Sequence, residues 1–174
     1  EVEALLADEM RSYVGCSEVE ARVISGQMAN AVVFSGLVDY LNRLDRKSEP
    51  RRIRKVMNHH LGRGGHLSAQ PMGALRDFVA IDPLTERPSV VPFPVMKDDL
   101  YQIDLSKTEE LLEIHKPELI ILGKSMVLYK EPLKEIAQMA SNIKPRPIIH
   151  YDMAHVLGLI GPYFQEPFKE GADI

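Results

Sequence analysis

Residues 147–160 read Pro-Ile-Ile-His-Tyr-Asp-Met-Ala-His-Val-Leu-Gly-Leu-Ile, and this stretch decides the fold. The apolar pair Ile148 and Ile149 leads to an acid, Asp152, which is followed by His155 and by a turn residue, Gly158. The pattern predicts a buried strand whose carboxyl end carries a carboxylate and an imidazole. Because open α/β sheets bind their ligands at the carboxyl ends of strands, we expect Asp152 and His155 to face a crevice.

Two interpretations of Asp152 follow from its chemistry. A carboxylate beside a cationic ring nitrogen stabilises the protonated ring, since opposite charges at short range favour both charged forms. A cofactor that acts as an electron sink needs such a ring. Alternatively, an aspartate at a strand end caps the helix that comes next. The other segments of the chain have to decide between the two.

The composition is that of an ordinary soluble domain. The chain has 174 residues, of which 45% are hydrophobic and 26% charged, as in soluble globular domains. The net charge of −4 gives no reason to expect a nucleic-acid partner. The single cysteine, Cys16, excludes an internal disulfide and suits a reducing compartment, for which we expect the cytoplasm. No apolar run reaches the roughly 18 residues of a membrane span, so no membrane partner is expected.

The ends of the chain favour a piece of a longer protein. The sequence begins at Glu1 without a methionine and stops at Gly171-Ala172-Asp173-Ile174, which is typical of a strand that has just begun. We expect further chain on both sides.

Strands and helices are predicted in alternation from Lys55 onward. This alternation indicates an α/β fold with a largely parallel sheet and right-handed crossovers. Prolines at 88, 92 and 94 confine one strand, 90–93, to an edge or loop. Helices are expected over 1–14 with Gly15 as C-cap, and over 31–41, 68–75, 104–115 and 133–142. Extended segments are expected over 19–24, 55–58, 78–81, 90–93, 119–122 and 148–152.

Small residues precede the second helix, in the order Ser25-Gly26-Gln27-Met28-Ala29-Asn30. Free backbone N–H groups at a helix start bind phosphate together with the helix dipole. The alternative is an ordinary serine N-cap.

A glycine-rich loop occupies residues 62–67, Gly-Arg-Gly-Gly-His-Leu. Paired glycines let the backbone approach a ligand closely, and His66 behind them could lie flat on a planar ring or cap the next helix. No metal site is predicted, because the adjacent His59 and His60 point to opposite faces of a strand. The basic stretch 43–55 is a solvated connection or a contact for a polyanionic substrate tail.

Four segments together resemble the pocket motifs of serine hydroxymethyltransferases, a family of fold-type I pyridoxal phosphate (PLP) enzymes. The runs Gly-Gly-His-Leu at 64–67 and Asp-Met-Ala-His-Val-x-Gly-Leu at 152–159 are specific to this family, and 25–30 and 123–125 follow its order. The resemblance covers nearly the whole chain. It implies a three-layer α/β fold, with residues 1–174 forming part of the PLP-binding large domain. The N-terminal arm and the C-terminal small domain would be absent.

The resemblance also implies roles for single residues. His66, Asp152 and His155 would be catalytic: His66 stacking on the pyridine ring, Asp152 pairing with its nitrogen, and His155 lying near the ring and its oxygen. Further contacts to the cofactor and to folate are implied for two groups of residues. The contacts to PLP are Ser25, Gly26, the backbone of Gln27, and Ser125, which would lie near the phenolic oxygen. The contacts to folate are Leu61, Gly65 and Leu67.

Some positions depart from the family pattern. Gln27 replaces a small residue of the phosphate loop, while Arg63 and Ala69 stand where the family usually has histidines. The lysine that holds the cofactor covalently is expected beyond Ile174. Lys124 is not assigned this role and is expected to be a solvated charge.

The implied activity is transfer of a hydroxymethyl group between serine and glycine, with tetrahydrofolate as co-substrate and a homodimer as the assembly. Another fold-type I enzyme, a 3-hydroxy amino acid aldolase or lyase, is the alternative. A homologue without chemistry is a further one, in which case this chain would bind cofactor or partner only.

Overall fold

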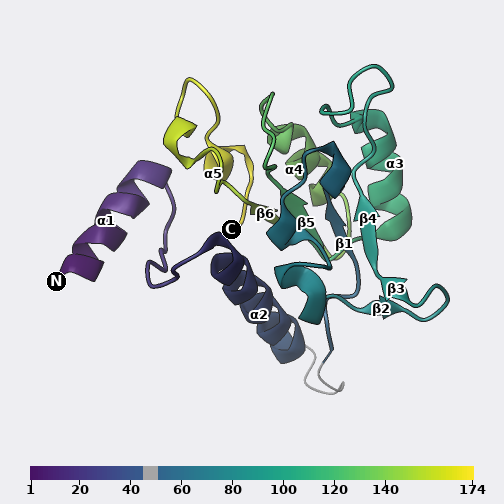
Figure 1. Ribbon diagram of the computed structural model, residues 1–174, viewed down its shortest axis with the longest axis horizontal. Coiled ribbons are helices and arrows are strands. Elements are labelled where there is room, and N and C mark those ends of the chain that lie inside the picture. Colours follow the sequence, from purple (N-terminus) through teal and green to yellow (C-terminus); the bar gives the residue numbers. More distant parts are fainter. Residues whose placement is uncertain (45–50) are drawn as a thin grey trace.

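The computed structural model describes residues 1–44 and 51–174 (Figure 1). Residues 45–50, the middle of the basic stretch, lie outside the described residues. Among the described helices, none has the length and apolar character needed to cross a membrane.

A four-stranded parallel sheet forms the centre of the fold, in the order β4-β1-β5-β6. Its strands are β1 (Val56–Asn58), β4 (Val90–Pro92), β5 (Leu119–Leu122) and β6 (Ile148–Tyr151). Every neighbouring pair runs parallel, which confirms the predicted sheet. The proline-containing β4 lies at the edge, as expected for a strand whose Pro92 cannot donate to a ladder.

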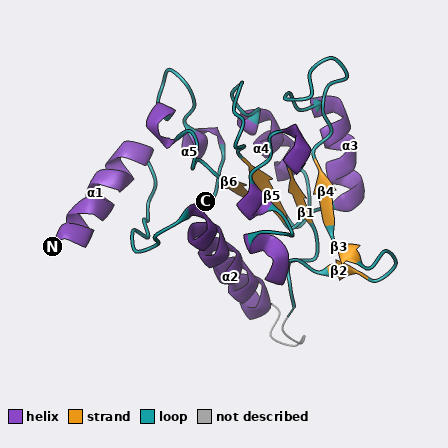
Figure 2. Cartoon of the chain, in the orientation of Figure 1, coloured by secondary structure: helices purple, strands orange, loops and turns teal. Residues whose placement is uncertain are grey.

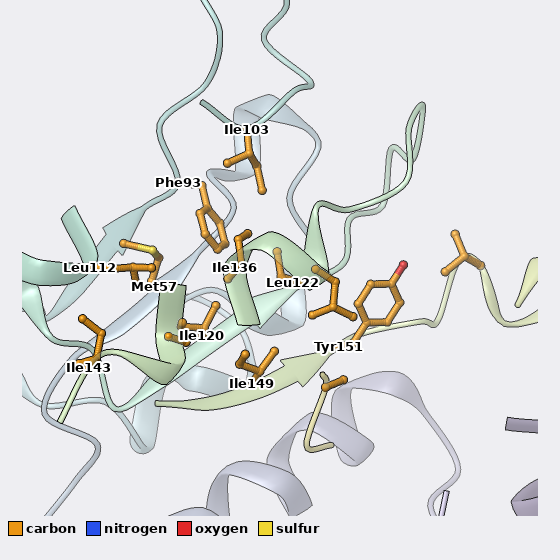
Figure 3. Packing of buried hydrophobic residues seen from close by; sticks show 14 residues of the cluster. Met57, Phe93, Ile103, Leu112, Ile120, Leu122, Ile136, Ile143, Ile149 and Tyr151 are labelled. Atoms are coloured by element: carbon orange, nitrogen blue, oxygen red, sulfur yellow. The ribbon is translucent and has the colours of Figure 1, made fainter. Parts of the chain in front are cut away.

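Helices cover both faces of the sheet, so the expected three layers are present (Figure 2). On one face, α3 (Leu105–His115) and α4 (Leu133–Ser141) pack on a cluster that includes Ile120, Ile149 and Tyr151 (Figure 3). On the other face lies α2 (Gly26–Leu44), whose Phe34 and Leu37 pack with Val56, Leu119 and Ile121. The two clusters follow from the alternation of side chains along β1 and β5.

Helix α1 (Val2–Val14) ends as predicted at Gly15, whose φ of 78° is the left-handed conformation that glycine adopts readily. It buries no residue and stands apart from the sheet in Figure 1. Among the described residues, one hydrogen bond joins it to the rest: the Tyr13 hydroxyl donates to the Leu157 carbonyl at 3.0 Å.

Several predicted elements are wrong or misplaced. Residues 19–24 form no strand, and α2 begins at Gly26 rather than at 31. Instead of a helix over 68–75 there are two 3-10 turns, η2 (Leu67–Ala69) and η3 (Ala74–Asp77). Between them the backbone of Gly73 comes so close to Leu67 that a Cβ would lie 2.2 Å from the Leu67 carbonyl oxygen, so only glycine fits there.

The expected strand over 78–81 is displaced. It is β2 (Ile81–Asp82), which pairs antiparallel with β3 (Arg87–Pro88). The remaining short elements are η1 (Leu61–Arg63), η4 (Leu157–Leu159) and α5 (Pro167–Glu170).

The last residues of the chain lie alongside β6. The Asp173 N–H donates to the Ile149 carbonyl and the Tyr151 N–H donates to the Ile174 carbonyl, both at 2.8 Å. These bonds continue the hydrogen bonding of the sheet beyond β6, although residues 171–174 are not assigned as a strand.

Candidate active site

Asp152 leaves the end of β6 on the face that α2 covers. Its N–H donates to the Leu122 carbonyl at 2.9 Å, which fixes the backbone against β5. Its Oδ1 accepts the Ala154 N–H at 3.1 Å. The capping interpretation is therefore partly right, but the side chain caps a turn, since the following η4 begins only at Leu157.

The other oxygen of Asp152 faces two residues that are distant in sequence. Oδ2 accepts a hydrogen from Asn30 Nδ2 at 2.9 Å and lies 3.3 Å from His66 Nδ1. Among the described residues, no lysine or arginine forms an ion pair with Asp152. A carboxylate held by neutral donors keeps its negative charge available for a ligand.

The loop that carries His66 is bonded to the loop after β5. The Gly64 carbonyl accepts the N–H groups of Ser125 and Met126 at 2.9 and 3.2 Å, and Gly65 forms a bridge with Lys124. A Cβ on Gly65 would lie 2.7 Å from the His59 carbonyl oxygen. Only glycine fits at this close approach, which sets the position of the next residue, His66.

The structure shows one of the two roles that the sequence left open for His66, the helix cap. Its Nδ1 accepts the Ser68 N–H at 3.3 Å, so it caps η2. Its ring also lies 5.2 Å from the ring of His155, in an edge-to-face arrangement. The two imidazoles and Asp152 are thus brought together, and His155 is exposed to solvent beside them.

The start of α2 lies next to this cluster. Ser25 Oγ accepts the Met28 N–H at 3.1 Å, so the serine is an N-cap. The N–H groups of Gly26 and Gln27 have no acceptor among the described residues. Two such groups at the positive end of a 19-residue helix are suited to an anion.

A cavity of about 220 Å³ connects the helix start with the strand end, and its lining includes Gly26, Asn30 and Asp152. The position of a Cβ on Gly26 lies 4.0 Å from Ala154 Cβ. The acid and the first residue of α2 therefore share one cavity, and His66 adjoins it through its contact with Asp152.

The residues assigned to folate differ in exposure. Leu61 and Leu67 are 39% and 53% exposed, while Gly65 is buried. Ser125 is exposed directly beside Gly64. Ala69, which replaces a family histidine, lies in the core cluster under α2, so this replacement changes packing.

Two residues of the site, Asn30 and Ser68, were missed as functional residues by sequence reasoning. Both are 3% exposed and hydrogen-bonded to each other. A signal was present for Asn30, because it is a polar residue on the face of α2 that also carries Phe34 and Leu37.

The expectation that Lys124 is a solvated charge is wrong. The side chain is 4% exposed, donates to the Tyr101 carbonyl at 2.7 Å and lies 3.5 Å from Glu131. Glu131 also lies 3.1 Å from His59. Burial acts to raise the pKa of Glu131, but the contact with His59 and the charge of Lys124 outweigh it and hold that pKa below its usual value.

Comparison with known proteins shows which family the chain resembles. The family profile described as "Serine hydroxymethyltransferase" matches residues 2–174. A serine hydroxymethyltransferase from Korarchaeum cryptofilum is 30% identical over 176 residues, which cover all of this chain and 37% of that protein. Another, from Thermococcus kodakarensis, is 33% identical over 177 residues, covering 100% and 35% of the two chains.

A solved structure has the same fold. L-threonine transaldolase from Pseudomonas fluorescens superposes with a TM-score of 0.71 and 22% identity, over 99% of this chain and 34% of that one. The chain spans about a third of the length of the relatives it matches. From its sequence, its fold and these matches, the chain belongs to the serine hydroxymethyltransferase family of fold-type I PLP enzymes.

Proposed function

We propose that the protein carrying this chain transfers a hydroxymethyl group between serine and glycine, with PLP as cofactor and tetrahydrofolate as co-substrate. One observation carries the proposal: Asp152 lies 3.3 Å from His66 and shares a cavity with the start of α2. An anionic oxygen, an aromatic ring and free amides at a helix start are what a phosphorylated pyridinium requires.

The residues present fit this cofactor. The amides of Gly26 and Gln27 would hold its phosphate, and the partially exposed face of His66 would lie against its ring. When bound, PLP supplies an electron sink for a bond cleaved at the amino acid α-carbon.

The chain's own residues would prepare that sink. Asp152 would hold a proton on the ring nitrogen, because its negative charge would raise the pKa of a pyridine nitrogen bound beside it. The Asn30 amide and the Ala154 N–H keep the carboxylate aimed. His155 and Ser125 are both exposed, and Ser125 would donate to the phenolic oxygen.

The remaining parts of the proposal concern the whole protein. Lys124 is bonded to the Tyr101 carbonyl and paired with Glu131, so it is not proposed as the lysine that binds the cofactor covalently. Leu61, Gly65 and Leu67 would line the folate pocket. Residues 1–174 would be part of the large domain of a cytoplasmic homodimer.

A second function is favoured by Arg63, which stands next to Gly64 at the presumed folate pocket in place of a histidine. An arginine there is consistent with a 3-hydroxy amino acid aldolase or lyase that uses no folate. Folate dependence separates the two: equal cleavage of 3-hydroxy amino acids by the full-length protein with and without tetrahydrofolate would exclude the transferase.

The decisive experiment on the site is Asp152→Asn in the full-length protein. We expect PLP still to bind through its phosphate, but turnover to fall by at least about 100-fold, because the ring nitrogen is no longer held protonated. Undiminished turnover with normal cofactor absorbance would contradict the role of Asp152. The matched control is Asp82→Asn, which changes a carboxylate in the β2–β3 hairpin.

A further inference from the structure

Four residues of the candidate active site form a closed set of polar contacts: Asn30, Ser68, His66 and Asp152. Asn30 Nδ2 lies 2.6 Å from Ser68 Oγ and 2.9 Å from Asp152 Oδ2. Ser68 Oγ in turn contacts His66 Nδ1, which lies 3.3 Å from Asp152 Oδ2. Because Asn30 and Ser68 are each 3% exposed, these atoms have one another as partners rather than bulk water.

The positions of the hydrogens in this set of four residues follow from counting donors and acceptors. The amide nitrogen of Asn30 carries two hydrogens and has two oxygen neighbours, so it donates to Ser68 Oγ and to Asp152 Oδ2. The Ser68 hydroxyl then needs an acceptor for its own hydrogen. Among the described residues, its remaining side-chain neighbour is His66 Nδ1.

A second donor converges on the same ring nitrogen. The Ser68 main-chain N–H points at His66 Nδ1 from 3.3 Å. A neutral imidazole nitrogen that accepts hydrogen bonds carries no hydrogen, so its proton is on the other nitrogen.

We propose that Asn30 and Ser68 are positioning residues that hold His66 as the tautomer protonated on Nε2. This inference rests on the proposed function, because it concerns the hydrogen-bonding roles of two residues of the same cofactor site.

The assignment decides what His66 and Asp152 do to each other. With Nδ1 unprotonated, the 3.3 Å contact joins two acceptors and is no ion pair, so the imidazole leaves the carboxylate's charge uncompensated. Asp152 then keeps its full charge for the pyridinium nitrogen of a ligand. The Nε2–H of His66 remains as its one donor for an oxygen of substrate or cofactor.

The test reads the tautomer directly. The full-length protein, labelled with 15N at histidine and freed of cofactor, is studied by long-range 1H–15N correlation at pH 8, and His66→Gln identifies the His66 signals. We expect the pattern of an Nε2-protonated ring. Ser68→Ala should shift it toward the Nδ1-protonated form, because Asp152 Oδ2 is then the side-chain acceptor beside Nδ1.

Conservative variants separate positioning from a general effect on folding. Ser68→Thr keeps the hydroxyl and should restore the wild-type pattern, whereas Ser89→Ala removes another buried serine hydroxyl and should leave His66 unchanged. A titration with PLP gives a second readout: Ser68→Ala and Asn30→Leu should each raise the dissociation constant about tenfold, because Ser68→Ala removes the hydroxyl that contacts His66 and Asn30→Leu removes a hydrogen bond to Asp152. Asn42→Leu, near the other end of α2, should not.

Two results overturn the inference: a wild-type His66 protonated at Nδ1, or a His66 pattern that Ser68→Ala does not change. Absence of PLP binding by the wild-type protein contradicts the proposed function instead. The tautomer of the cofactor-free protein then still decides the inference.

Discussion

Asn30 on helix α2 and Asp152 at the end of β6 are joined by a 2.9 Å hydrogen bond across 122 positions of sequence. The bond ties the first turns of the helix to the acid at the strand end. A phosphate held by the helix start and a ring nitrogen held by Asp152 would therefore be kept at a fixed separation by the protein.

Gly26→Pro tests the helix start as a phosphate site. Gly26 is the first residue of α2, where proline fits without strain, so the variant removes one N–H and little else. The Cβ position is open enough, with Ala154 Cβ at 4.0 Å. We expect the dissociation constant for PLP to rise about tenfold, measured by absorbance titration. Gln27→Ala retains its amide and should bind normally; equal losses in both variants would argue against backbone binding.

Gly65→Ala tests how closely the His66 loop must approach the chain. The added Cβ would lie 2.7 Å from the His59 carbonyl oxygen, so backbone has to move. We expect a loss of about 1–3 kcal/mol in the free energy of unfolding, measured by urea denaturation of the full-length protein. Gly158→Ala adds the same methyl where nothing lies within 4 Å and should be nearly neutral. A neutral Gly65→Ala would show that the backbone at Gly65 can move away from the His59 carbonyl at no cost.

The four strands of the central sheet and the acid at the end of β6 could be predicted because their signals are local. Apolar runs such as 119–122 are too short for helices, and the prolines around β4 restrict it to an edge. The 3-10 turns could not be predicted, since the turn at Gly73 is set by its contact with the Leu67 carbonyl. The burial of Lys124 could not be predicted either, because its partners, Tyr101 and Glu131, come from separate loops.

Lys124→Met tests the buried charge cluster. Glu131 would keep His59 as a neighbour but lose its cation, and breaking a buried ion pair by removing one partner costs about 3–5 kcal/mol. Chemical denaturation should show this loss, and Lys124→Met combined with Glu131→Gln should recover part of it. Lys130→Met changes an exposed neighbour and should cost less than about 0.5 kcal/mol. Similar losses at 124 and 130 would mean that Lys124 is solvated after all.

His150 predicts a pH dependence of stability. The ring is buried against Phe34, with centroids 6.1 Å apart, and neither ring nitrogen has a hydrogen-bond partner among the described residues. Burial lowers the pKa of His150 from 6.5 to about 4, although the charge of Asp152 acts in the opposite direction. The unfolded chain therefore binds a proton near pH 6.5, which the folded protein does not take up until about pH 4.

Between these pH values the unfolded state holds more protons than the folded state. The free energy of unfolding therefore decreases as the pH falls from 6.5 to about 4. Over this interval the loss amounts to roughly 3 kcal/mol, at about 1.4 kcal/mol per pH unit. His150→Phe removes the titrating group while keeping the aromatic contact with Phe34. Urea unfolding of both full-length proteins should give parallel stabilities from pH 7 to 9 and a growing advantage for His150→Phe below pH 6.5. If the two stability curves remain parallel down to pH 4, the imidazole is hydrated or paired in the folded protein. The description of His150 as a buried neutral ring would then be wrong.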